Sequence, residues 1–202
     1  METYRFNFQR FREEHFEDYL SLVSNQNVMK MITGIALSRE EAFYKFQSII
    51  KTNISENDYG IYRVTLKQGN TFVGLGKIVK VDEKEAEIGY SLLPEHWHKG
   101  FGTEISEKLV VTASSNKGVE DLIAIVDPAN YASKRILKKS NFIMRKQCMI
   151  EGLPAEIFEY ARHITGYDAA NMVSERCVSL VDSGYYCIAD KDSKLIVDCG
   201  AV

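Results

Sequence analysis

Three strand-like segments follow one another with only short polar turns between them, and this run constrains the fold more than any other feature. Residues 59–66, 71–81 and 86–93 are rich in β-branched and aromatic side chains. Polar turns at residues 68–70 and 82–84 separate them, and turns of this kind join neighbouring antiparallel strands. We therefore expect an antiparallel meander in the middle of the chain.

After this meander the pattern alternates between helix and strand. Apolar side chains recur every four residues from Phe101 to Ala113, the spacing of a helix with one buried face. The next predicted elements are a mostly apolar strand at 119–126, a helix over 129–139 and strands at 142–150 and 155–161, around a turn at 151–154. In the helix over 129–139, the spacing directs Ala132, Ile136 and Leu137 inward. A strand joined to the meander through a helical crossover requires a mixed sheet.

The residues before the meander predict one strand and two helices. Aromatic and polar side chains alternate over 4–9, and apolar residues recur at helical spacing over 11–24. Ser38 and Glu41 form a capping box that begins the second helix, and residues 25–37 are a loop with room for a helical turn. The fold class is α/β (α+β), with a mixed, mostly antiparallel sheet flanked by helices.

Composition narrows the classes of function. The chain has 202 residues, 45% of them hydrophobic, and a net charge of -3, which is typical of a soluble protein with one domain. No overall basic field favours nucleic acid as a partner. The start lacks a signal peptide and no stretch has the 18 or so apolar residues that span a bilayer, so we expect a cytoplasmic protein without membrane contact.

The last forty residues fall outside the alternating pattern. We expect residues 1–162 to form the main domain and residues 163–202 a C-terminal extension, folded as a β-hairpin on or near that domain. Three of the four cysteines lie in this extension, without CxxC spacing and without a matching histidine pattern. We expect free thiols and no metal site.

A glycine-containing turn between the third meander strand and the next helix suggests an anion site. Gly100 and Gly102 let the backbone turn tightly, so that successive amide N–H groups can converge. The helix that begins there adds unpaired N–H groups and the positive end of its dipole, and Lys99 adds a charge. On its own this pattern is more often simple turn chemistry than phosphate binding.

Two longer sequence segments give a more specific indication of the ligand than the glycine turn alone. Residues 87–104 read EIGYSLLPEHWHKGFGTE, which resembles motif A of the GNAT acetyltransferase superfamily, particularly its RimJ/RimL-like branch, where G-Y-x-L-x-P leads to W-x-K-G-[YF]-[AG]-T-E. Residues 127–142, DPANYASKRILKKSNF, are similar to that branch's N-x-x-S-x-R-[VI]-L-x-x-x-[GN]-F segment. The resemblance covers roughly residues 3 to 162 and implies a GNAT-like fold.

The resemblance also implies a ligand and its contacts. Acetyl-coenzyme A is expected in a V-shaped opening between the strand that ends at Leu93 and the strand that ends at Val126. Pantetheine is expected to pair with backbone groups of Leu92 and Leu93, and the pyrophosphate with amides from His98 through Thr103. The residues expected to bind it are Leu92, Leu93, His98, Lys99, Gly100, Phe101, Gly102, Thr103, Asn130 and Ser133.

Departures from the family pattern bear on the chemistry. Many members have a tyrosine acid seven residues after the asparagine, and this position is Leu137 here. Ser133 is therefore expected to act as the acid or hydrogen-bond donor toward the leaving thiolate. Glu87 is the candidate base, although it is equally an ordinary strand carboxylate. Glu104, in the first turn of a helix, is expected to be structural.

The sequence thus predicts an N-acetyltransferase that moves an acetyl group to a primary amine, acting as a monomer or homodimer. A protein N-terminal α-amine is the favoured acceptor, and a small amine is the alternative. Two further hypotheses stay open at this point. One is a coenzyme A-binding regulatory module without catalysis, which Leu137 would fit, and the other is an interaction protein whose residues 163–202 dock a partner.

Overall fold

The computed structural model describes residues 1–55, 59–116, 118–162, 186–189 and 195–198. Its helices and strands are β1 (Phe6–Arg10), η1 (Glu13–His15), α1 (Phe16–Val23), α2 (Gln26–Met29), α3 (Arg39–Ser55), β2 (Gly60–Leu66), β3 (Phe72–Lys80), β4 (Glu85–Leu92), η2 (Pro94–His96), α4 (Phe101–Ser114), β5 (Asp121–Val126), α5 (Tyr131–Lys139), β6 (Phe142–Ile150), β7 (Leu153–Tyr160), β8 (Tyr186–Ala189) and β9 (Leu195–Asp198). This order confirms the predicted α/β fold class, and the described helices include none long and apolar enough to cross a membrane.

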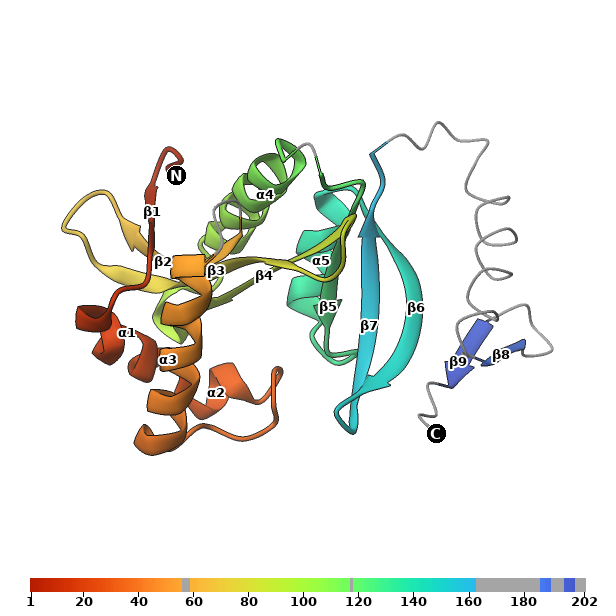
Figure 1. Ribbon diagram of the computed structural model, residues 1–202, viewed down its shortest axis with the longest axis horizontal. Helices are drawn as coiled ribbons and strands as arrows, with labels where there is room; N and C mark the ends of the chain where they lie inside the picture. The colour runs from red at the N-terminus through yellow and green to blue at the C-terminus, as the bar shows by residue number, and fades with distance from the viewer. Residues whose placement is uncertain (56–58, 117, 163–185, 190–194, 199–202) are drawn as a thin grey trace.

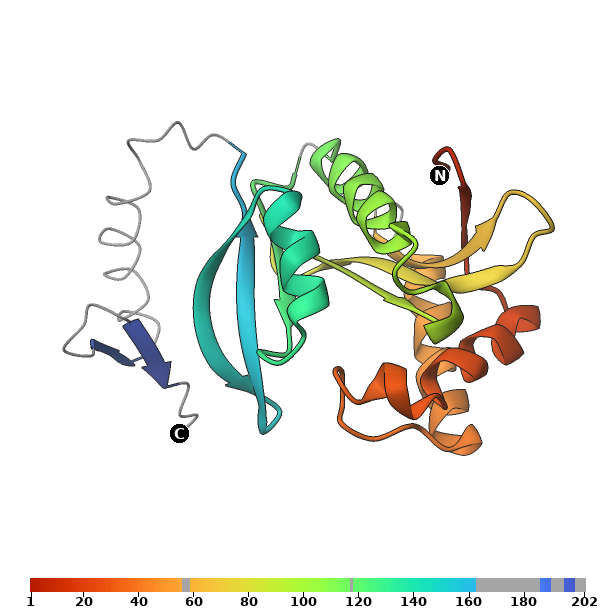
Figure 2. The same ribbon diagram turned by 180° about the vertical axis from the view of Figure 1, so that it is seen from behind.

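One seven-stranded sheet organises the domain, in the order β1-β2-β3-β4-β5-β7-β6. Its neighbours are antiparallel except β4 and β5, which run parallel because α4 crosses over between them. Figures 1 and 2 show α1, α2 and α3 on one side of this sheet and α4 and α5 on the other. Strands β8 and β9 pair antiparallel in a separate two-stranded sheet, and the rest of the predicted extension lies outside the described residues.

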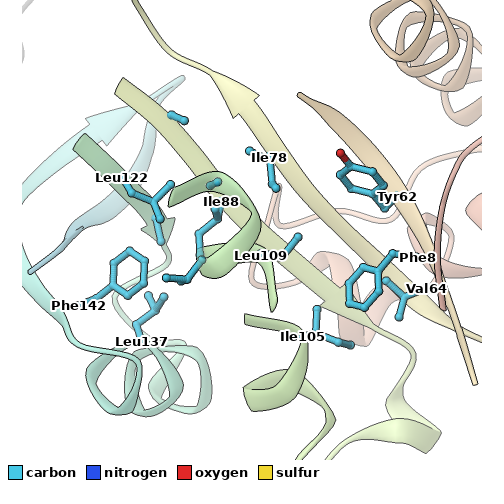
Figure 3. Close-up of a cluster of buried hydrophobic side chains, with 14 of the residues drawn as sticks. Phe8, Tyr62, Val64, Ile78, Ile88, Ile105, Leu109, Leu122, Leu137 and Phe142 are labelled. Atoms are coloured by element: carbon cyan, nitrogen blue, oxygen red, sulfur yellow. The ribbon is translucent and has the colours of Figure 1, made fainter. Parts of the chain in front are cut away.

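The main hydrophobic core lies between the sheet and helices α4 and α5. Ile105 and Leu109 of α4 are completely buried and pack over strands β2, β3 and β4 (Figure 3). Leu137 of α5 packs near Leu122 and Phe142 (Figure 3). A second cluster joins α1, α2 and α3 to the opposite face of the sheet. The two clusters lie on opposite faces of the sheet, and successive side chains of β4 point alternately to one face and the other.

Local sequence signals explain most of the element boundaries. The Ser38 N–H donates to Glu41 at 2.8 Å and the Glu41 N–H donates to the Ser38 hydroxyl at 3.3 Å, which confirms the capping box at the start of α3. Asn25 caps α2 by accepting from the Asn27 N–H, so the predicted loop does contain a helical turn.

Two local predictions were wrong. Ala132 is exposed, because the face of α5 that packs on the sheet runs through Ser133, Leu137 and Ser140 at helical spacing. The turn between β6 and β7 takes two residues rather than four. Glu151 and Gly152 both have positive φ, the conformation of a tight hairpin turn, and strand β7 begins directly after them.

The close approach of β3 and β4 depends on Gly74. A Cβ atom there would lie 2.0 Å from the Ser91 carbonyl oxygen and 2.8 Å from the Leu92 Cα, both backbone atoms that cannot move aside. We predict that Gly74→Ala lowers the free energy of unfolding by about 3 kcal/mol, measured by urea denaturation. The matched control is Gly118→Ala, whose Cβ would meet only an ordinary contact at 3.6 Å. Equal stability of the two variants would contradict the prediction.

Candidate functional site

The site lies where β4 and β5 separate. These strands pair only from Glu85 to Glu87 against Asp121 to Ile123, and in the described chain no strand pairs with the β5 side of β4 after that point. A cleft of about 380 Å³ occupies the separation and is lined by residues of both strands. The predicted V-shaped opening is therefore present.

The cleft takes its lining from both faces of the sheet. Tyr90 of β4 reaches it from the side that carries α4 and α5, together with three residues in or beside α5: Asn130, Ser133 and Leu137. Lys77 and Glu87 reach it from the opposite side, with residues 31–33 after α2 and the β6–β7 turn. This division follows from the alternation of side chains along β4. The half of the cleft beside α5 and the half beside Lys77 can thus bind two different ligands.

At one end of β4 the glycine turn has the backbone shape of an anion site. His98 and Gly100 both have positive φ (60° and 71°), and Gly100 is the N-cap of α4. A turn of this kind gathers N–H groups on its concave side, where the first N–H groups of the helix lack intrahelical partners. His98, Lys99 and Gly100 are all exposed, so an anion can reach these amides.

Arg5 fixes the opposite side of this turn from a position 95 residues earlier than Gly100. Its guanidinium donates to the carbonyl oxygens of Lys99 at 3.1 Å and Gly100 at 3.3 Å. In a planar trans peptide the C=O and the following N–H point in opposite directions. Holding these carbonyls therefore turns the N–H groups of Gly100 and Phe101 away from Arg5. The arginine also lies over the Phe101 ring, 4.6 Å from its centroid.

Glu104 holds Arg5 in place. Its carboxylate accepts from the Arg5 N–H at 2.9 Å and from Nε at 2.6 Å. Burial acts to raise the pKa of Glu104, but hydrogen bonds from Thr3 and Arg5 outweigh it, so the pKa lies below its ordinary value. The carboxylate is thus charged at neutral pH. The predicted structural role fits these contacts, with Arg5 as a partner that the prediction did not include.

Several backbone groups at the end of β4, which the sequence predicted to bind pantetheine, already form hydrogen bonds within the protein. The Leu93 N–H donates to the Val73 carbonyl at 2.9 Å, and the Leu93 carbonyl accepts from the His96 N–H at 3.0 Å. The Leu92 carbonyl accepts from the Trp97 indole at 2.8 Å. Hydrogen bonding to β3 alternates along β4, so the Leu92 N–H faces the cleft side. The Leu92 carbonyl faces the same side, because the N–H and C=O of one strand residue point the same way, but it is already bonded to the Trp97 indole.

The first turn of α4 packs against Tyr90, which lines the cleft. A Cβ on Gly102 would lie 2.9 Å from Ile136 Cδ1 and 3.2 Å from Tyr90 Cε2, so a side chain there would require both neighbours to shift. The Phe101 ring packs edge-on against Phe6 at 4.9 Å between centroids. Among the predicted ligands of coenzyme A, Phe101 and Gly102 therefore offer backbone groups only.

Asn130 and Ser133 begin α5 beside the cleft. The Asn130 side chain accepts from the Ser133 N–H at 3.1 Å and caps the helix. The structure brings both residues to the cleft lining, as the sequence predicted. Tyr131, the first residue of α5, is 74% exposed and is not part of this lining.

Tyr90 carries a buried hydroxyl without a hydrogen-bond partner among the described residues. Burial raises the pKa of Tyr90 to about 12, and the nearby Ser133 hydroxyl acts in the opposite direction. The two hydroxyl groups are therefore close, but they are not aligned as a formed hydrogen bond. Such loose geometry is common in catalytic sites without ligand.

Glu87 is bound by Lys77 across the opposite half of the cleft. Lys77 Nζ lies 2.5 Å from Glu87 Oε1, and the Glu87 side chain is 13% exposed. A Cβ on Gly89 would lie 2.5 Å from Lys77 Cε, so the absent side chain of Gly89 lets the lysine stem lie across β4. As a base, Glu87 would have to exchange this contact for one with the acceptor.

Comparison with known proteins agrees with this geometry. The family described as "Acetyltransferase (GNAT) domain" matches residues 5–143. An uncharacterized N-acetyltransferase of Bacillus subtilis, YoaA, is 27% identical over 171 residues, which are 80% of this chain and 94% of that protein.

Two solved structures share the fold over most of their length. Spermidine N-acetyltransferase from Vibrio cholerae, in complex with coenzyme A and spermine, has a TM-score of 0.64 at 15% identity and covers 78% of this chain and 94% of its own. RimL, a ribosomal α-N-protein acetyltransferase in complex with coenzyme A, has a TM-score of 0.65 at 15% identity, with the same coverage of 78% and 94%.

A sheet that opens between two parallel strands beside an amide-lined turn is the arrangement of an acyl-coenzyme A-dependent transferase. The chain belongs to the GNAT acetyltransferase family. It is an N-acetyltransferase, and acetyl-coenzyme A is its acetyl donor.

Sequence reasoning missed Arg5 and Lys77 at this site. Arg5 is far from the turn in sequence, and its only local signal is its place between Tyr4 and Phe6 in the strand predicted at 4–9. Lys77 had a weak signal in the glycine at residue 89, which leaves room for a crossing side chain. Both residues act through contacts between distant segments, so motif spacing does not reveal them.

The contacts of Arg5 lead to a prediction about donor affinity. Arg5→Ala should raise the Kd for coenzyme A about tenfold, because two carbonyl groups of the turn lose charge-assisted hydrogen bonds. Isothermal titration calorimetry measures this affinity. The control is Arg39→Ala, which removes an equally charged side chain whose partner Glu17 lies far from the turn in sequence. An unchanged Kd for Arg5→Ala would show that the turn keeps its shape without the arginine.

Proposed function

We propose that this enzyme acetylates the α-amino group of a peptide or protein N-terminus whose first residues are apolar. The main support is the small number of carboxylates in the cleft that are free to bind a positively charged acceptor. Three carboxylates line the cleft, but Glu87 is bound by Lys77, and Asp127 accepts from the Ala129 N–H at 2.7 Å. Glu151 is the third, on the exposed β6–β7 turn.

A polyamine acceptor would need several carboxylates that are free to pair with its charges. An N-terminal amine needs little more than one polar contact and space for its side chain. The apolar residues Ile32, Ile125 and Leu153 line the same cleft and are each more than a third exposed. They provide the surface that an apolar N-terminal residue would bury. The RimJ/RimL-like motif supports the same acceptor class.

In this proposal the donor half of the cleft holds acetyl-coenzyme A. Amides from His98 through Thr103 bind the pyrophosphate, with Lys99 adding a charge. Asn130 contacts the pantetheine arm, and Ser133 lies at the sulfur. The Leu92 N–H, directed toward the cleft, donates to the thioester carbonyl and stabilises the oxyanion as the amine attacks.

The acceptor amine must be neutral to attack. An α-amino group has an ordinary pKa near 7.7–8.0 and a lysine side chain near 10.4, so an N-terminal acceptor loses its proton to water at modest cost. Glu87 then serves as a base through an intervening water molecule. The RimL and spermidine acetyltransferase structures are equally similar in fold, so the choice between their acceptor types rests on these charges and not on the comparison.

A matched acceptor panel tests the proposal. We predict thiol release from acetyl-coenzyme A with a peptide that has a free apolar N-terminus, and none with the same peptide blocked at its N-terminus but carrying an internal lysine. With the free peptide, kcat/KM should rise with pH and level off above about pH 8. A kcat/KM for spermidine above that of the peptide would contradict the acceptor assignment. Binding of coenzyme A without release by any amine would favour a regulatory module.

A second prediction concerns Glu87. Glu87→Gln should lower kcat/KM for the peptide acceptor about a hundredfold at pH 7, the lower end of general acid–base contributions. Its coenzyme A affinity should not change, because Glu87 lies on the opposite face of the sheet from Ser133. Lys77→Met provides the comparison, since it keeps an apolar stem over Gly89 while releasing the carboxylate. If Glu87→Gln retains full activity, water alone takes the proton.

A further inference from the structure

The buried hydroxyl of Tyr90 has no role in the proposed site so far. It lies in the cleft lining, and no described group completes a hydrogen bond with it. Buried polar groups in native proteins are rarely left unpaired, because an unmade hydrogen bond costs free energy. A hydroxyl kept in this state next to a binding cleft suggests that its partner is engaged only when the ligand is bound.

The surroundings of the Tyr90 ring determine where this hydroxyl can act. The ring lies against Gly102: its Cε2 atom is 3.2 Å from the place that a Cβ on this residue would occupy. The first turn of α4 therefore limits the movement of the ring. On the other side, Ser133 is the group whose hydroxyl acts on that of Tyr90. The Ser133 N–H is already bonded to Asn130, which fixes the first turn of α5. Two anchored helices therefore hold the two hydroxyl groups near each other.

The donors and acceptors of this pair favour one direction of hydrogen bonding. A serine hydroxyl has one proton and two lone pairs, so it can accept one hydrogen bond and donate another. If the Tyr90 hydroxyl donates to Ser133 Oγ, the serine proton is free to point elsewhere. Burial keeps the Tyr90 phenol protonated at neutral pH, because its pKa is raised to about 12. The remaining direction for the Ser133 proton is into the cleft that both residues line.

We propose that Tyr90 is a positioning residue that donates a hydrogen bond to Ser133 and directs the serine proton toward the thioester sulfur. This inference rests on the proposed function, because it assigns a residue of the acetyl transfer step. It also gives Leu137 an explanation. A tyrosine acid is absent from that position of α5, and the β4 tyrosine acts from the neighbouring strand through the serine.

The chemical step balances with the groups already named. The amine nitrogen forms a bond to the acetyl carbon, and the amine proton passes through a water molecule to Glu87. The carbon–sulfur bond breaks with its electron pair on sulfur, where the Ser133 hydroxyl donates a hydrogen bond to the thiolate. The thiolate then takes a proton from water, and Tyr90 and Ser133 keep their own protons throughout.

Tyr90→Phe tests the inference because it removes the hydroxyl and keeps the ring that packs on Gly102. We expect kcat to fall about tenfold, with KM for both substrates within twofold of wild type. Because the lost hydroxyl is unpaired in the enzyme without ligand, Tm measured without coenzyme A should stay the same or rise. A merely structural tyrosine would instead lower Tm. Tyr131→Phe is the control, since that tyrosine is exposed and outside the cleft lining, and its kcat should not change.

A double-mutant cycle separates positioning from an independent effect. Ser133→Ala should lower kcat at least as much as Tyr90→Phe, and the double variant should be no slower than Ser133→Ala alone. Multiplied losses in the double variant, or full kcat in either single variant, would overturn the inference. If Tyr90→Phe does not fold, Ser133→Ala with full kcat is decisive alone. If the variants contradict the inference while the wild-type enzyme still releases thiol, the proposed function stands. A wild-type enzyme without thiol release overturns both the proposed function and this inference.

Discussion

The short pairing between β4 and β5 is the constraint on which the rest of the site depends. Because only three residue pairs join these parallel strands, β4 keeps backbone groups directed to a side without a strand, and a ligand can take that place. The separation persists because both strands are held elsewhere. Strand β4 pairs with β3 along its length, and β5 pairs with β7. A sheet that closed here would be better hydrogen-bonded, but it would have no room for an extended cofactor arm.

The alternation of side chains on β4 then divides the chemistry. Tyr90 faces α4 and α5, where we propose that the donor binds, while Glu87 faces the side of Lys77, where we propose that the amine binds. One strand thus contributes to both substrates without the two sets of side chains competing for space. Gly89 belongs to this division as well, because its missing side chain gives Lys77 a path to Glu87.

Periodicity and turn chemistry predicted the order of elements from residue 1 to 162, since strand and helix spacing depend on nearby residues. The capping box at Ser38 and the glycine turn at Gly100 were likewise local signals. Errors arose where packing decided the outcome, as with the exposed Ala132. Three features could not be predicted, because each depends on segments brought together only by folding. They are the backbone hydrogen bonds of Leu93, the hydrogen bonds from Arg5 to the turn, and the unpaired hydroxyl of Tyr90. Family resemblance supplied the ligand, but it could not supply these contacts.

The contact of Arg5 with the turn has a consequence for how the motif can be used. The loop of residues 97–102 is not a self-contained unit, because two of its carbonyl groups accept hydrogen bonds from Arg5, which lies directly before β1. A peptide that carries the motif alone would lack this restraint, and so would the same loop grafted onto another scaffold. In the newly made chain the turn can take this shape only after α4 has been synthesised and has met the segment that carries Arg5. Shape at this turn is therefore a property of the whole domain.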